Sequence, residues 1–201
     1  MADRELTTLE HIVLGLIAEE AQSGYSIISA LESGSHRWSA SPGSVYPILK
    51  RLEAQACIVG ELELVYETRP RKMYTLTDHG SVLLDQWLRA PLSWSEVLDE
   101  RDVVLVKFLF MEKRLPRAAV IGWLDAYEQL TDEFDPDSRI FHDAFSERPP
   151  SLHQQLIHEA TMLELNMQRS WIQMTRRRLQ TEPERTEHGS TAQTEIDTEI
   201  E

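Results

Sequence analysis

The stretch Ser-Pro-Gly-Ser-Val-Tyr-Pro-Ile-Leu-Lys-Arg-Leu-Glu, residues 41–53, predicts a helix with two different faces. Proline is tolerated only in the first turn of a helix, so Pro47 places the start near Gly43 or Ser44. The helix then runs to about Ala56. With about 3.6 residues per turn, one face is apolar and belongs in a core: Val45, Ile48, Leu49, Leu52 and Ala56. The opposite face carries Tyr46, Pro47, Lys50, Arg51 and Ala54.

Two shorter helices are predicted upstream of this stretch. The sequence Thr-Thr-Leu-Glu at residues 7–10 is a capping box, which marks the start of a helix. The small and polar residues 21–24 end that helix. A second helix follows, in which Tyr25, Ile28 and Leu31 are spaced three apart.

Downstream, the hydrophobic period changes from helical to alternating. The apolar residues Leu62, Leu64 and Tyr66 alternate with glutamates nearby at 61, 63 and 67, which predicts a strand. Residues 68–71 form the tip of a hairpin, residues 73–76 return as a second strand, and residues 77–80 cap another helix. Three helices followed by a two-stranded wing predict an N-terminal winged helix-turn-helix over residues 1–90.

The exposed face of the third helix and the hairpin tip have the composition of a DNA-binding surface. Lysine and arginine neutralise phosphates or bond to guanine edges, and a tyrosine hydroxyl reaches a phosphate oxygen. The candidate DNA-binding residues are Ser44, Tyr46, Pro47, Lys50, Arg51, Arg69, Arg71 and Lys72. An ordinary solvated helix face and an exposed turn are the alternatives.

At this point the sequence resembles the PadR family of transcriptional regulators. The matching pieces are Ser23-Gly24-Tyr25, residues 41–53 and residues 69–80. Residues 65–68 lack the glycines that usually precede Arg-Pro-Arg in this family. The resemblance implies a winged helix whose DNA-facing and wing residues include Tyr46, Lys50, Arg51, Arg71 and Lys72. It also implies that residues 91–180, which resemble the helical domain of a longer PadR subfamily, make a homodimer.

Residues 91–180 themselves read as helices. We expect one helix over residues 98–111, a second with Pro116 at its first position that ends near Phe134, an irregular connection over residues 135–151, and a last helix over residues 152–179. The overall fold class is therefore mostly α: an N-terminal winged helix-turn-helix with a two-stranded β wing, and a C-terminal all-helical dimerisation domain.

The last helix carries a continuous apolar seam at helical spacing. Its members are Leu156, Ala160, Leu163, Met167, Trp171 and Met174, the candidate dimer-interface residues. Packing within one chain is the alternative. Residues 176–178 are three arginines, which we expect to offset the dipole at the end of the helix.

The resemblance further implies a small aromatic effector, as for the phenolic acids or drugs to which members of the family respond. Our candidate ligand residues are Trp94, Trp123 and His158. Core and dimer packing is the other explanation for the tryptophans. With an effector, we expect a ligand-responsive repressor of a palindromic operator; the sequence leaves activation open.

Composition sets limits on the alternatives. The net charge is −14, but the tail over residues 181–201 holds seven acidic residues against one arginine, so a basic surface elsewhere is compatible with it. We expect this tail to be disordered. No catalytic set, metal-ligand spacing, cofactor motif, membrane span or signal peptide is evident, and we expect a non-enzymatic cytoplasmic protein with Cys57 buried and inert. The competing function is a winged-helix adaptor that binds protein rather than DNA.

Overall fold

The computed structural model describes residues 4–33, 41–64, 70–133 and 151–182, and most of them are helical. The helices are α1 (Thr8–Glu19), α2 (Gly24–Ser33), α3 (Pro42–Ala54), α4 (Asp78–Arg89), α5 (Trp94–Leu98), α6 (Arg101–Arg114), α7 (Arg117–Asp132) and α9 (Leu152–Thr181). The strands are β1 (Gln22–Ser23), β2 (Ile58–Leu64) and β3 (Pro70–Leu76). The predicted tail lies outside the described residues from position 183 onward.

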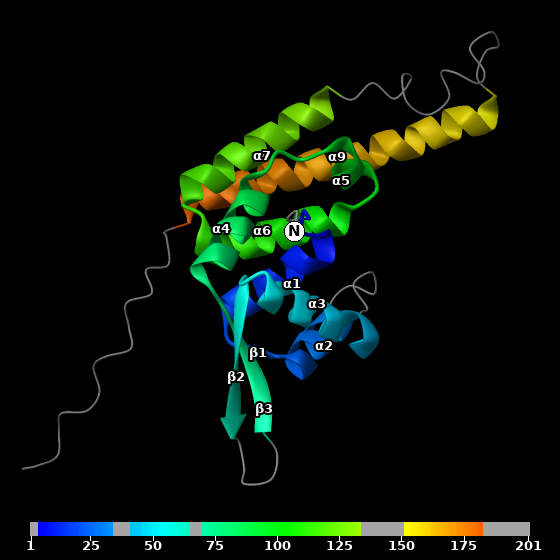
Figure 1. The fold of residues 1–201 in the computed structure, drawn as a ribbon. Coiled ribbons are helices and arrows are strands. Elements are labelled where there is room, and N and C mark those ends of the chain that lie inside the picture. Colours follow the sequence, from blue (N-terminus) through cyan, green and yellow to red (C-terminus); the bar gives the residue numbers. More distant parts are fainter. Residues whose placement is uncertain (1–3, 34–40, 65–69, 134–150, 183–201) are drawn as a thin grey trace, which may run out of the picture.

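Helices α1 to α3 and the antiparallel hairpin β2–β3 form the predicted winged helix (Figure 1). The hairpin is in register from Ile58 opposite Leu76 to Leu64 opposite Pro70. The sheet has a third strand, because β1 pairs with β3, and its order is β1-β3-β2. The sequence analysis read this segment only as a helix break, since two residues are too few to show a strand period.

Helix α3 is where the structure corrects the sequence most clearly. It starts at Pro42, with Ser41 as N-cap, so Pro47 lies inside the helix rather than in its first turn. The helix ends at Ala54, and Ala56 is exposed rather than part of the core. The backbone N–H groups of Ala56 and Cys57 bond to the carbonyls of Glu53 and Leu52. This is the Schellman arrangement that ends a helix, with Ala56 in the left-handed region at φ 54°.

The C-terminal helices also differ from expectation in detail. The predicted helix over residues 98–111 is interrupted, because the backbone leaves helical geometry at Glu100 (φ −125°, ψ 41°) and separates α5 from α6. Pro116 is the N-cap of α7, not its first residue. The last helix begins as predicted and continues two residues further, to Thr181. The connection after α7 lies outside the described residues except Ser151, which caps α9.

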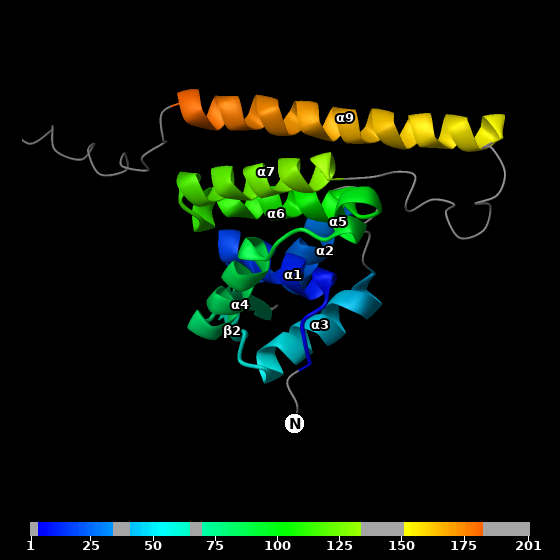
Figure 2. The same ribbon diagram turned by 90° about the horizontal axis from the view of Figure 1, so that it is seen from above.

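The molecule is layered, with the winged helix at one end and α9 at the other (Figures 1 and 2). Helix α6 lies between them and packs against α1 of the winged helix, and one buried apolar cluster extends from α1 to α9. At the contact of α1 with α6, Gly15 leaves no room for a side chain: a Cβ there would lie 2.2 Å from the Phe110 ring. The boundary at residue 90 stays a prediction, since the core is continuous across it.

Candidate DNA-binding surface

Helix α3 presents one buried and one exposed face. Val45, Ile48, Leu49 and Leu52 are buried, and the candidate residues Ser44, Tyr46, Pro47, Lys50 and Arg51 are all exposed. The amphipathic pattern of the sequence therefore corresponds to a buried and an exposed face of α3. Its outward face is free to meet a ligand outside the molecule.

Tyr46 leans on the start of α2. Its side chain is 52% exposed, and a Cβ on Gly24 would lie 2.6 Å from the tyrosine ring. A side chain at position 24 would therefore displace the Tyr46 ring. Its neighbour Tyr25 is 77% exposed, although the sequence analysis grouped it with the buried Ile28 and Leu31. Tyr25 is thus an exposed aromatic at the start of α2, which spacing alone did not reveal.

Arg51 is not a free cation. Its Nε forms an ion pair with Oε1 of Glu10, a carboxylate on α1 that is fully buried, while the Arg51 side chain remains 42% exposed. Burial alone would raise the pKa of Glu10. Hydrogen bonds from Thr7 and the charges of Arg51 and Arg4 outweigh that effect and lower this pKa. The pair ties the exposed face of α3 to the first turn of α1.

The cations of the wing are also paired with acids. Lys72 Nζ donates to both carboxylate oxygens of Glu53 on α3, at 2.7 and 2.8 Å, and the hydrogen bond raises the pKa of Lys72. Arg71 donates to Glu63 across the hairpin at 3.1 Å. Arg69 lies outside the described residues. Lys50 makes no ion pair within the part of the chain that the structure covers.

Helix α9 leaves most of its predicted seam uncovered. Leu156, Ala160, Leu163, Met167 and Met174 are exposed, and Trp171 is half-buried. The residues that α9 turns toward its own chain are Leu165, Gln168, Ile172 and Thr175. Helix α6 contributes two further exposed leucines, Leu105 and Leu109, which the sequence analysis did not include.

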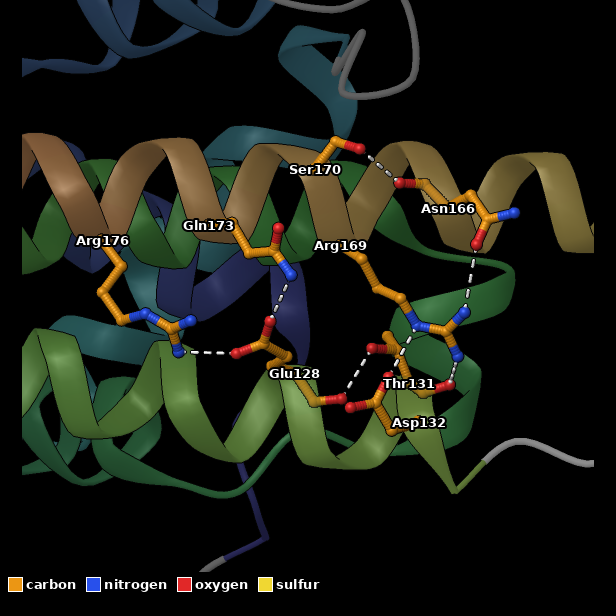
Figure 3. Close-up of polar contacts among 8 residues, drawn as sticks. All are labelled: Glu128, Thr131, Asp132, Asn166, Arg169, Ser170, Gln173 and Arg176. Carbon is orange, nitrogen blue, oxygen red and sulfur yellow. Dashed lines mark hydrogen bonds and ion pairs between the residues drawn. The ribbon is translucent and has the colours of Figure 1, made fainter.

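Polar side chains fasten α9 to α7 (Figure 3). From the sequence, Arg176 was expected to offset the dipole of its own helix. In the structure it pairs instead with two acids of α7, Glu128 at 2.6 Å and Asp125 at 2.7 Å. Arg169 pairs with Asp132 and donates to the carbonyl of Thr131 at the end of α7. These contacts hold the C-terminal half of α9 and leave its apolar seam facing outward.

Comparison with known proteins identifies the family. The family model of the transcriptional regulator PadR-like family matches residues 13–86. The negative transcriptional regulator PadR of Bacillus subtilis is 36% identical over 146 residues, which are 66% of this chain and 80% of that protein. The chain belongs to the PadR-like family of transcriptional regulators.

A second relative of this PadR-like chain matches a somewhat larger share of it. A probable transcriptional regulator of Mycobacterium tuberculosis is 25% identical over 167 residues, 74% of this chain and 85% of that protein. Among solved structures, the crystal structure of Bacillus subtilis PadR in complex with operator DNA matches with 22% identity and a TM-score of 0.43. That match covers 86% of this chain and 99% of the other. Family membership confirms the prediction of a transcriptional regulator rather than an enzyme.

The candidate ligand residues of the PadR-like chain lie on three helices. Trp123 on α7 is buried and packs edge-to-face on Tyr127, at 5.8 Å between ring centroids, and Tyr127 lies 6.5 Å from Trp171. Burial raises the pKa of Tyr127 to about 12. Trp94 on α5 and His158 on α9 are half-buried. Within the described residues, the indole N–H of Trp123 has no hydrogen-bond acceptor.

Residues 4–33, 41–64, 70–133 and 151–182 contain no group of three or more histidine, cysteine or acidic side chains placed to hold a metal ion. No helix within those ranges has both the length and the apolar character to cross a membrane.

Proposed function

We propose that this PadR-like regulator binds operator DNA directly and represses transcription. Helix α3 enters the major groove, and the β2–β3 wing lies against the neighbouring phosphates. The observation that carries this proposal is the exposed face of α3, where Tyr46, Lys50 and Arg51 stand opposite a fully buried apolar face. Repression is supported by the relative from Bacillus subtilis, which is a negative transcriptional regulator.

The test of direct binding uses Lys50, whose ammonium makes no ion pair within the described residues. The wild-type chain first selects a duplex from a random-sequence library. Lys50→Glu should then weaken binding to that duplex at least about tenfold, because a favourable phosphate or base contact becomes a repulsive one. Arg177→Glu, the same charge change at an exposed site on α9 at the opposite end of the molecule, is the control (Figure 2).

Equal weakening by both variants would attribute the effect to net charge. Loss confined to Lys50→Glu supports the surface of α3. A wild-type chain that selects no duplex favours the adaptor function, in which the winged helix binds protein.

We also propose that the regulator acts as a homodimer on a palindromic operator. The support is the exposed seam on α9, where Leu163 is 71% exposed in the single chain. Contiguous apolar surface of this kind usually marks an interface. Two α3 helices related by a two-fold axis then match two inverted half-sites.

A small aromatic ligand is the proposed release signal. It is supported by the aromatic side chains of α7 and α9 and by the buried indole N–H of Trp123. This N–H would donate a hydrogen bond to a carboxylate or hydroxyl oxygen of the ligand. An effector weakens DNA binding only if it binds the DNA-free form more tightly. Titration of 4-hydroxycinnamate should quench tryptophan fluorescence, with lower affinity when the selected duplex is present. Equal affinity with and without duplex would contradict this switch.

A further inference from the structure

The carboxylate of Glu10 divides its two oxygens between two helices. Oε2 accepts hydrogen bonds from the backbone N–H of Thr7 at 2.6 Å, from the Thr7 hydroxyl at 3.0 Å and from Arg4 at 3.2 Å. This oxygen alone completes the capping box of α1. Oε1 accepts no hydrogen bond of regular geometry from the described residues, and its partner is the guanidinium of Arg51 on α3.

Capping does not require the charge of Glu10. A capping box is made by glutamine as well as by glutamate, and this chain uses both. At the start of α9, the neutral side chain of Gln154 completes the box with Ser151. At the start of α5, Glu96 caps Ser93 with Oε2 and pairs with Lys107 of α6 through Oε1. The two glutamates thus each use the second oxygen to hold a cation of another helix.

Fixing Arg51 has consequences for recognition. The contact to Glu10 engages Nε, one of five donors of a guanidinium, and the side chain keeps a large exposed area on the proposed DNA-binding face. An arginine already held in one rotamer loses less conformational entropy when it binds. The cost is that the Glu10 charge lies beneath a surface that meets phosphates. That charge opposes binding to any DNA, whatever its sequence.

We propose that Glu10 is a positioning residue for operator recognition: it holds Arg51 in one orientation on α3 and thereby favours the operator over other DNA. The inference rests on the proposed function. It predicts that loss of the Glu10 charge weakens binding to the operator without weakening binding to random DNA, a combination that a role in helix capping or in net charge would not produce.

The test is Glu10→Gln, which keeps the volume and the capping acceptor and removes the charge. Affinity for the duplex selected by the wild-type chain should fall about 2- to 10-fold, the range expected for immobilising one long side chain on binding. Affinity for a random duplex should stay the same or rise, since a negative charge is gone. The ratio of operator to random affinity, measured at one salt concentration, therefore falls.

Two controls separate positioning from stability. Ser93→Ala removes the capping hydroxyl of α5, which contacts neither Glu10 nor Arg51, so it should lower the unfolding midpoint and leave the affinity ratio unchanged. In an Arg51→Gln background, Glu10→Gln should have no further effect on the ratio, because the residue it acts through is absent. If Glu10→Gln does not fold, Glu10→Asp withdraws the carboxylate from Arg51 by one methylene, keeps the charge, and should lower the ratio as well.

The outcomes are distinct. A ratio that stays at the wild-type value in Glu10→Gln, or in Glu10→Asp where that variant is needed, would overturn the inference. So would an unchanged effect of Glu10→Gln in the Arg51→Gln background. A wild-type chain that selects no duplex would instead refute the proposed function on which the inference rests.

Discussion

Ala56 occupies the left-handed position at the end of α3, where glycine has no steric cost. An L-residue with a side chain pays about 1–2 kcal/mol in this region. Glycine would remove this strain from the folded chain. It would also increase the conformational entropy of the unfolded chain, which offsets part of the gain in stability. Ala56→Gly should therefore raise the free energy of unfolding by about 0.5–1 kcal/mol, measured by urea denaturation.

Ala54 is the matched control for this prediction. It is also an exposed alanine, two residues earlier, but it is the last residue of α3 and has helical geometry. Ala54→Gly should lower the free energy of unfolding by about 0.5–1 kcal/mol. The same sign of change in both variants would show that Ala56 is not strained.

Glu10 also sets a pH dependence. Its pKa is lower in the folded chain than the ordinary value of 4.5, because hydrogen bonds from Thr7 and the charges of Arg51 and Arg4 outweigh burial. A carboxyl with a lowered folded pKa contributes stability that is fully present above 4.5 and is lost as the pH falls through the folded pKa. Between pH values of about 6 and about 3.5, the wild type should lose more unfolding free energy than Glu10→Gln. Parallel losses would show that other carboxyls account for the acid sensitivity.

At the scale of elements, the buried Lys107 connects the C-terminal helices to the winged helix, through an ion pair on one side and an aromatic ring on the other. Lys107 on α6 is 2% exposed, and its Nζ lies 2.6 Å from Oε1 of Glu96 on α5. The same ammonium lies 5.1 Å from the ring centre of Trp87 on α4, which stacks on His11 of α1 at 4.9 Å. Four helices therefore meet around one lysine.

Removing one partner of a buried pair leaves an uncompensated charge. Lys107→Met should lower the free energy of unfolding by about 3 kcal/mol, because the Glu96 carboxylate then lacks its cation. Lys107→Met combined with Glu96→Gln should recover much of this loss, since glutamine still completes the capping box of α5 and no charge remains. Both variants are compared by urea denaturation. A double variant less stable than Lys107→Met would contradict this account.

The elements that the sequence predicted well are those with a strong local period or cap. The buried face of α3 and the start of α1 at Thr7 follow directly from residue spacing and the capping box. The break at Glu100 was missed, because the apolar run that follows contains no glycine or proline. The pair of Glu10 with Arg51 was also missed, since it joins two helices far apart in the sequence and depends on their packing. The exposed cations of α3 and the wing were thus predicted from the sequence, but their acidic partners were not.

At the scale of the whole molecule, α9, which carries the exposed seam, lies at the end opposite α3 (Figure 2). The N-terminal half of α9 extends beyond α7 in both views and carries Leu156 and Leu163 (Figures 1 and 2). A second copy packed on this seam places its own α3 at a distance set by the length of the molecule. The proposed dimer contact therefore determines the spacing of the two α3 helices.

Charging the seam tests this arrangement. In Leu163→Asp with Met167→Asp, each substitution would bury an unpaired carboxylate in the dimer, at a cost on the order of several kcal/mol in total. Both positions are exposed in the single chain, so its own core is left intact. The double variant should sediment as a monomer at low micromolar concentration and keep a folded, helical circular dichroism spectrum. Ala126→Asp, at an exposed site on α7, is the control and should remain dimeric.

The same variant separates the contribution of α3 to binding one half-site from the contribution of the dimer to binding a full palindrome. A dimer binds a full palindrome much more tightly than one half-site, because the second α3 binds at a high effective concentration. A monomer with an unchanged α3 keeps its contacts to one half-site and gains little from the second. The ratio of full-site to half-site affinity should therefore be large for the wild type and for Ala126→Asp, and close to one for the double aspartate variant. A double variant that stays dimeric would refute the seam as the interface, and a monomer that keeps the wild-type ratio would show that the two half-sites are not read by paired α3 helices.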